Sequence, residues 1–242
     1  MTEKVSISVI VPAYNEEKNL ASAISTIKSA LGDRFSSYEI IIIDDKSSDR
    51  TGLIADNLAN HDKNIKAFHN PNNMGFGYNY RLGVKNATKD YVALVPGDNE
   101  ILEVSIKAIF NLVGASDMVL AYHTNLEVRP PLRRFLSRVF TAILNFLFGN
   151  HIKYYNGPNV YKRELVNKVP ISTNGFAFQV EILTRLLRSG HSYVEAGMKI
   201  CERTHGSSKA LYPKNVLSVL STIARLYWEL KVCCLPSRYR KA

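Results

Sequence analysis

Asp90–Glu100 reads DYVALVPGDNE. The apolar run Tyr91–Val95 predicts a buried strand that ends at a Pro-Gly pair, and a new periodic segment follows it. Asp98 and Glu100 therefore stand just after the carboxyl end of a strand, which is where an open α/β sheet binds its ligand. Two carboxylates so close together can share a hard cation such as Mg²⁺ or Mn²⁺. A solvated turn before a helix is the alternative interpretation of the same residues.

Further strands of the same kind precede this stretch. Val5–Val11 and Tyr38–Ile43 are apolar and rich in β-branched residues, and Asn64–His69 is a weaker third run. Segments with helical periodicity separate the runs, so the order is βαβαβαβ. This order predicts an α/β fold with a mostly parallel sheet and helices on both faces. The strands' carboxyl ends then meet at one edge, which brings Asp44-Asp45 close to Asp98.

The overall composition narrows the function further. The chain has 242 residues, and its 31 Lys and Arg exceed its 21 Asp and Glu by ten. That charge suits a phosphorylated substrate or an anionic membrane surface. The basic residues are spread along the chain without a stacking motif, so we expect no nucleic-acid partner. The chain contains neither GxGxxG after its first strand nor a Walker lysine motif, which disfavours a dinucleotide or P-loop site.

The sequence also indicates how the protein relates to a membrane. It has no uninterrupted run of about 20 apolar residues, so we expect no transmembrane helix. An apolar run starts within its first five residues, so we expect no signal peptide, and its three cysteines lack zinc or disulfide spacing. We therefore expect a peripheral protein on the cytoplasmic face of a membrane.

Four motifs carry a family resemblance. They are Val9–Glu16 (VIVPAYNE), Ile40–Asp49 (IIIIDDKSSD), Asn73–Gly83 (NMGFGYNYRLG) and Tyr91–Asp98. In this order and spacing they resemble family 2 glycosyltransferases of GT-A fold, and most closely the dolichyl- and polyprenyl-phosphate sugar synthases. A weaker match covers Gly157–Lys209. The resemblance implies a Rossmann-like, mostly parallel sheet flanked by helices.

The resemblance also implies a division of the chain. Residues 1–210 are expected to form the GT-A domain, with a nucleotide-sugar-binding half at 1–100 and an acceptor half at 101–210. Residues 211–242 are expected to form an amphipathic C-terminal helix and a basic tail. The apolar positions of that helix recur at steps of four and three: Val216, Leu220, Ile223, Tyr227, Leu230 and Cys234. Three roles remain open for this helix. It can pack on the core, form the interface of a homo-oligomer, or contact a membrane.

Site residues follow from the resemblance position by position. The implied nucleotide-binding residues are Pro12, Ala13, Tyr14, Glu16, Asp44 and Asp45. Asp98 is implied as the catalytic, metal-binding aspartate, with Glu100 as the second ligand of Mg²⁺ or Mn²⁺. The family's first metal-motif aspartate falls on Pro96, so the chain departs from the pattern there.

A cluster of arginines suggests where the acceptor binds. Arg129–Arg138 reads RPPLRRFLSR, and an apolar, aromatic-rich segment follows at Val139–Phe148. Arginine forks suit phosphate oxygens, and the apolar segment can lie in a bilayer interface. The resemblance implies an acceptor loop and helix here, with Arg138 as a catalytic residue. The predicted acceptor-phosphate contacts are Arg129, Arg133, Arg134, Ser137 and Arg138. The alternative is a solvated cationic turn before a helix packed on the sheet.

Four further residues match family positions near the sugar and diphosphate: Gln179, Glu181, Arg203 and Lys209. A salt bridge from Glu181 to Arg185 along a helix is an equally good interpretation. The family often carries an arginine after the fifth strand. This chain reads Ala121-Tyr122-His123 there, and no role is assigned to His123.

The implied reaction is an inverting, metal-dependent sugar transfer. The donor would be a UDP- or GDP-linked sugar and the acceptor a polyprenyl or dolichyl phosphate at a membrane surface. Two alternatives stay open. One is transfer to a saccharide, and the other is a non-catalytic scaffold that binds nucleotide sugar or membrane, suggested by Pro96.

Overall fold

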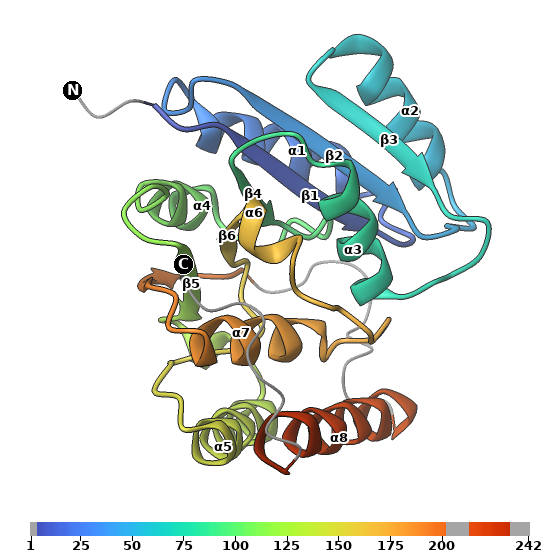
Figure 1. The fold of residues 1–242 in the computed structure, drawn as a ribbon. Helices are drawn as coiled ribbons and strands as arrows, with labels where there is room; N and C mark the ends of the chain where they lie inside the picture. Colours follow the sequence, from blue (N-terminus) through green and yellow to red (C-terminus); the bar gives the residue numbers. More distant parts are fainter. Residues whose placement is uncertain (1–3, 202–212, 233–242) are drawn as a thin grey trace.

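One seven-stranded sheet organises the protein. The computed structural model describes residues 4–201 and 213–232 (Figure 1). The strands pair in the order β3-β2-β1-β4-β6-β5-β7. Their bounds are β1 Ile7–Ala13, β2 Tyr38–Asp44, β3 Ile65–His69, β4 Tyr91–Leu94, β5 Met118–His123, β6 Val160–Lys162 and β7 Tyr193–Met198. Only β6 runs antiparallel to its neighbours, so the predicted mostly parallel sheet is confirmed.

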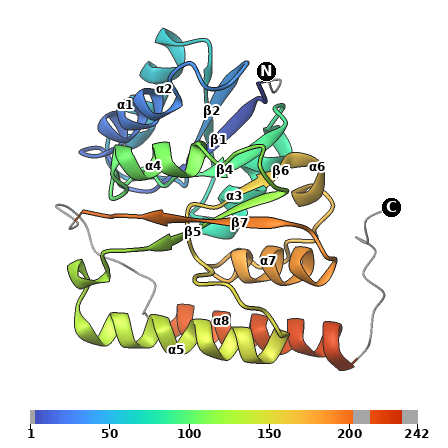
Figure 2. The same ribbon diagram turned by 90° about the vertical axis from the view of Figure 1, so that its left-hand side faces the viewer.

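Helices cover both faces of this sheet. They are α1 Leu20–Leu31, α2 Thr51–His61, α3 Phe76–Asn86, α4 Glu103–Phe110, α5 Pro131–Phe148, α6 Arg163–Val166, α7 Phe178–Arg188 and α8 Pro213–Tyr227, with η1 Leu126–Val128 and η2 Trp228–Val232. α1 and α4 pack on one face, and α3 and α7 on the other. α5 and α8 form an outer layer beyond α7 in both views (Figures 1 and 2).

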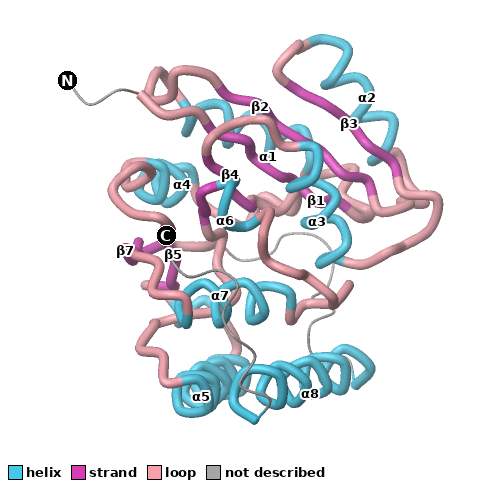
Figure 3. The backbone as a smooth tube through the Cα atoms, in the orientation of Figure 1, coloured by secondary structure: helices cyan, strands magenta, loops and turns pink. Residues whose placement is uncertain are grey.

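The strands are apolar throughout because both faces of the sheet are buried. Along β1, Val9 and Val11 enter the core under α1 and α4, while Ile10 enters the core under α3 and α7. All three side chains are 0% exposed. This burial on both faces is what near-continuous apolar runs indicate in a parallel sheet. Figure 3 shows β1, β2 and β3 ending on the same side of the molecule, where loops lead into the following helices.

The C-terminal helix is present as predicted, but its inner face differs from the predicted stripe. Ile223 and Leu230 are buried against the domain, whereas Leu220 is 57% exposed. Cys234 lies outside the described residues. In the part of the chain that the structure describes, no helix is both long and apolar enough to span a bilayer.

A buried carboxylate, that of Glu39, lies near the amino end of β2 and joins several segments there. Glu39 accepts hydrogen bonds from Ser8 Oγ (2.7 Å), Thr88 N (2.7 Å) and Lys66 Nζ (2.7 Å). Burial opposes ionisation, but these donors outweigh it and lower the pKa of Glu39 to about 2. The ionised carboxylate therefore stabilises the folded state.

Glu39→Gln is expected to lower the free energy of unfolding at pH 7 by about 2 kcal/mol, because buried donors lose their charged acceptor. The folded pKa lies below the ordinary value, so the wild-type advantage is complete above about pH 5 and disappears as the pH falls toward 2. Urea unfolding at pH 7 and pH 3 measures this difference. Glu164→Gln, at an exposed position, is the control. A gap between wild type and Glu39→Gln that is equal at both pH values would contradict the assignment.

Candidate active site

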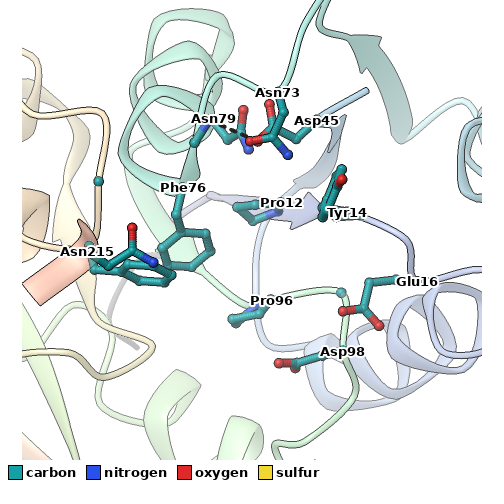
Figure 4. Close-up of a pocket in the computed structure, with 15 residues that line it drawn as sticks. Pro12, Tyr14, Glu16, Asp45, Asn73, Phe76, Asn79, Pro96, Asp98 and Asn215 are labelled. Carbon is teal, nitrogen blue, oxygen red and sulfur yellow. Dashed lines mark hydrogen bonds between the residues drawn. The ribbon is translucent and has the colours of Figure 1, made fainter. Parts of the chain in front are cut away.

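A cavity of about 380 Å³ lies at the carboxyl ends of β1, β2 and β4 (Figure 4). The predicted nucleotide-binding residues that line it are Pro12, Ala13, Tyr14, Glu16 and Asp45. Asp98 lines it as well. Figure 4 shows Glu16 and Asp98 on one side and Asp45 with Asn79 on another. These residues come together because the strands are parallel and in register: Ala13 pairs with Asp44, and Ile10 pairs with Leu94.

The turn after β1 is held against the start of α2. Asn15 has a φ of 57°, a left-handed conformation that Asn tolerates better than most residues. Its Oδ1 accepts a hydrogen bond from Ser48 N (2.8 Å), and its N donates to Ser47 Oγ (2.9 Å). Glu16 N donates to Thr51 Oγ1 (2.7 Å). These contacts fix the backbone that carries Tyr14 and Glu16 into the cavity.

The two aspartates after β2 differ in their surroundings. Asp45 is 3% exposed, and its carboxylate accepts from Met74 N (2.7 Å) and Gly75 N (2.9 Å). Asp45 thus holds the loop that forms one wall of the cavity. Asp44 lines neither this cavity nor its neighbour. It accepts from Ser47 N (3.1 Å) and contacts His69 Nδ1 (3.2 Å).

Gly75 and Gly77 let that loop approach a second segment closely. Gly75 has a φ of 95°, and a Cβ there would lie 2.6 Å from the carbonyl oxygen of Asn174. A Cβ on Gly77 would lie 2.6 Å from the carbonyl oxygen of Thr173. Gly77 N donates to the Asn174 carbonyl (2.8 Å). The segment around Asn174 continues into Gly175 and Phe176, which also line the cavity.

A second cavity, about 100 Å³ in volume, adjoins the first and shares Phe76, Pro96 and Asp98 with it. Its other polar lining residues are Glu100, His123, Arg129, Asn156 and Gln179. Asp98 therefore stands at the junction of the two cavities. Of the residues predicted for metal, acceptor and sugar, the fold brings Glu100, Arg129 and Gln179 to this same place.

The pair Asp98 and Glu100 fits a divalent cation that completes its shell with substrate oxygens. Glu100 N donates to Asp98 Oδ1 (3.3 Å), and the intervening Asn99 has a φ of 55°. Cys201 N donates to the Glu100 carbonyl (2.9 Å), which braces the turn. Among the described residues, no group of three or more His, Cys, Asp or Glu side chains is placed to hold a metal. Mg²⁺ usually binds through one or two carboxylates plus substrate phosphates, so this donor set suits it.

His123 belongs to the site, although the sequence analysis assigned it no role. It ends β5 and lines the second cavity. Burial, and then the charges of Arg129 and Arg133, lower its pKa to about 3, so its imidazole is neutral at physiological pH. Its Nδ1 is buried with no hydrogen-bond partner in the described structure. A neutral imidazole here can donate one hydrogen bond to a ligand or accept one from it. Placing the end of β5 at the same sheet edge would have identified it.

The remaining arginines of the predicted acceptor cluster lie outside both cavities. Arg129 Nη1 donates to the Tyr154 hydroxyl (3.5 Å) at the second cavity. On α5, Arg133, Arg134 and Ser137 are half-buried and Arg138 is exposed. Their contact with an acceptor phosphate stays a prediction.

Of the four predicted sugar and diphosphate residues, the structure brings one to a cavity. Gln179 lines the second cavity, and its Oε1 accepts from Asn159 Nδ2 (2.7 Å). Glu181 is 0% exposed and lines neither cavity. The alternative partner of Glu181, Arg185, pairs instead with Glu229 of η2 (2.6 Å). Arg203 and Lys209 lie outside the described residues.

Glu181 holds neighbouring segments of the protein together rather than lining a cavity. Its carboxylate accepts from Ser172 N (2.9 Å), Ser172 Oγ (2.5 Å) and Thr173 N (3.1 Å). It also pairs with Arg225 Nη2 of α8 (2.7 Å). Asn215, near the start of the same helix, lines the first cavity opposite Tyr14 (Figure 4).

Comparisons with known proteins agree with this geometry. The family model described as "Glycosyl transferase family 2" matches residues 8–169, more than half of the chain. Polyprenol monophosphomannose synthase of Mycolicibacterium smegmatis is 29% identical over 214 residues, which cover 83% of this chain and 79% of that protein. Dolichyl-phosphate beta-glucosyltransferase of Trichomonas vaginalis is 31% identical over 146 residues, covering 55% of this chain. The match spans only 45% of that protein's own length.

Solved structures resemble the whole fold. Glucosyl-3-phosphoglycerate synthase from Mycobacterium tuberculosis, in complex with Mn²⁺, UDP-glucose and phosphoglyceric acid, has a TM-score of 0.70 and 17% identity. The superposition covers 92% of this chain and 80% of that one. The predicted GT-A fold is thereby confirmed.

Proposed function

The chain belongs to glycosyl transferase family 2, and from this premise we propose that it transfers a sugar from a nucleoside-diphosphate sugar to a polyprenyl phosphate. Transfer would occur at a membrane surface and with inversion at the sugar carbon. The observation that carries the proposal is the position of Asp98 at the junction of two cavities, one lined by the predicted nucleotide-binding residues and the other by Arg129. The protein's relatives include a polyprenol monophosphomannose synthase.

The donor is assigned to the first cavity. Its volume of about 380 Å³ is within the usual range for small-molecule sites, roughly 300–1,000 Å³. Backbone and side-chain groups of the turn after β1 and of the loop held by Asp45 would bind the nucleotide, which is UDP or GDP. Mg²⁺ or Mn²⁺ at Asp98 and Glu100, when bound, supplies positive charge that stabilises the diphosphate leaving group.

The second cavity favours a phosphate acceptor over a hydroxyl. A phosphate monoester has a second pKa near 6, so it is a ready nucleophile at neutral pH and needs no general base. A saccharide hydroxyl would need one. The carboxylates that line this cavity, Asp98 and Glu100, are assigned to the metal. The low pKa of His123 makes it a weak base. Arg129 offers a guanidinium to the phosphate oxygens.

This division of labour extends to the whole chain. We assign residues 1–100 to nucleotide-sugar binding and residues 101–210 to the acceptor. Residues 211–242 include α8, which reaches the first cavity through Asn215. On this proposal the protein is peripheral and works at the cytoplasmic face of a membrane.

Purified protein with Mg²⁺, a short polyprenyl phosphate in detergent and radiolabelled UDP- and GDP-sugars is expected to give a chloroform-soluble labelled product. The product should be lost with EDTA. Arg129→Ala should raise the acceptor KM about tenfold or more and change the donor KM less, because a charge-assisted hydrogen bond to phosphate is lost.

Arg188→Ala, at an exposed position on α7, is the matched control and should leave both KM values unchanged. Label that appears on a saccharide and not on the lipid would identify the alternative acceptor. Metal-dependent binding of the donor with no transfer to either acceptor would reject the catalytic proposal in favour of the scaffold.

A further inference from the structure

Exposed apolar side chains gather on one side of the protein. Of the 15 large hydrophobic residues that are exposed in the described structure, 11 lie on α5, α8 and η2. The most exposed include Leu132, Phe135 and Phe146 of α5 and Leu217, Leu220 and Trp228 of the C-terminal segment. Exposed apolar side chains that gather on one surface commonly mark an interaction site. We call this surface the α5–α8 face.

The two helices form one continuous layer. Figure 1 shows α5 and α8 side by side, and Figure 2 shows α8 behind α5 at the same level, beyond α7 and farthest from β1–β3. The rings of Phe148 and Tyr227 lie 6.4 Å apart between centroids and join the two helices. Leu144 of α5 and Leu226 of α8 are both 0% exposed and pack inward. The exposed apolar residues therefore lie on the opposite, outer side of this layer.

The net charge of α5, α8 and η2 indicates which kind of partner this face binds. α5, α8 and η2 together contain six Lys or Arg residues and a single acidic residue, Glu229. Glu229 is ion-paired with Arg185 of α7 (2.6 Å), and one of the six cations, Arg225, is ion-paired with Glu181 of α7 (2.7 Å). A face that combines apolar side chains with net positive charge is complementary to an anionic lipid surface. A second copy of the chain would instead bring two positively charged faces together.

We propose that the α5–α8 face docks on an anionic lipid bilayer, with its apolar side chains at the boundary between headgroups and acyl chains. This inference rests on the proposed function in that it names the surface from which the lipid acceptor arrives. Two features connect α8 to the rest of the domain and to the first cavity. Arg225 pairs with the buried Glu181, and Asn215 of the same helix lines the first cavity.

Binding to vesicles of phosphatidylcholine with 30% phosphatidylglycerol tests the docking without donor or acceptor. The wild-type protein should sediment with these vesicles and should dissociate from them as the salt concentration is raised. Leu217→Glu and Phe146→Glu should each weaken the binding about tenfold or more, because a buried apolar contact becomes a charge. Leu53→Glu, on α2, is the matched control: Leu53 is 66% exposed and Leu217 is 67% exposed. All three positions are exposed, so the variants should keep the wild-type melting temperature.

Three results would overturn the docking: wild type that does not bind the vesicles, Leu53→Glu that loses as much binding as Leu217→Glu, or a dimer in solution that Leu217→Glu separates. The transfer assay in detergent distinguishes this outcome from failure of the proposed function. Transfer to a detergent-solubilised acceptor without vesicle binding would reject the docking alone. Vesicle binding without transfer to any acceptor would reject the proposed function alone.

Discussion

Asp98→Asn is expected to lower the rate of metal-dependent transfer by about 10²-fold or more while the fold stays intact. The change keeps the shape of the side chain but removes the negative charge that attracts a divalent cation. Loss of a single preorganised electrostatic contact to a developing charge commonly costs ~10²–10³ in kcat. Of the acidic residues that line the two cavities, Asp98 alone borders both, so no other lining carboxylate occupies an equivalent position.

The measurement is kcat at saturating donor and acceptor over a series of Mg²⁺ or Mn²⁺ concentrations, with the melting temperature as the test of folding. Asp33→Asn, at an exposed position after α1, is the matched control and should behave as wild type. Near-normal turnover by Asp98→Asn would remove this residue from the catalytic site. Glu100→Gln should have a smaller effect, because Glu100 lines the second cavity alone.

The proline at position 96 makes Asp98 more important. Pro96 borders both cavities, where it contributes no ligand atom from its side chain. The resemblance puts an aspartate at this position, so the chain offers one carboxylate fewer than its family pattern. The remaining oxygen ligands would have to come from Glu100 and the donor diphosphate, which makes the metal site dependent on bound substrate.

The sequence predicted the donor half of the fold well because local and global signals agree there. Apolar runs such as Val9–Val11 are buried on both faces, so their composition reports a parallel sheet directly. Parallel pairing then brings the strand ends together, which is why Asp45 and Asp98 could be placed at one cavity from the sequence. The same logic placed Asp44 there, but a one-residue step along the chain turns its side chain toward His69.

The acceptor half was harder to predict, since its elements are short and their pairing is not local. β6 spans three residues and runs antiparallel between β4 and β5, a position that no periodicity reveals. His123 could not be recognised without that pairing. On α8, the apolar repeat identified the helix, but packing against α7 decides that Leu226 is buried and Leu220 exposed.

The largest expected loss of stability comes from Glu181, which sequence reasoning placed at the sugar. Glu181→Ala should lower the free energy of unfolding by ~3–5 kcal/mol, because it leaves buried donors of Ser172 and Thr173 without an acceptor and Arg225 without its partner. Glu181→Gln keeps one acceptor oxygen and should lose about half as much. Urea unfolding at pH 7 measures both variants.

The same substitution should also weaken donor binding, although Glu181 touches neither cavity. The segment that Glu181 holds at Ser172 and Thr173 continues into Gly175 and Phe176, which line the first cavity. Arg225→Ala is the matched test of the ion pair alone. The Arg225 side chain is 45% exposed, so its removal should cost only ~1 kcal/mol. If Glu181→Ala raised the donor KM with no loss of stability, the carboxylate would act on the sugar directly, and the positioning role argued from its burial would be wrong.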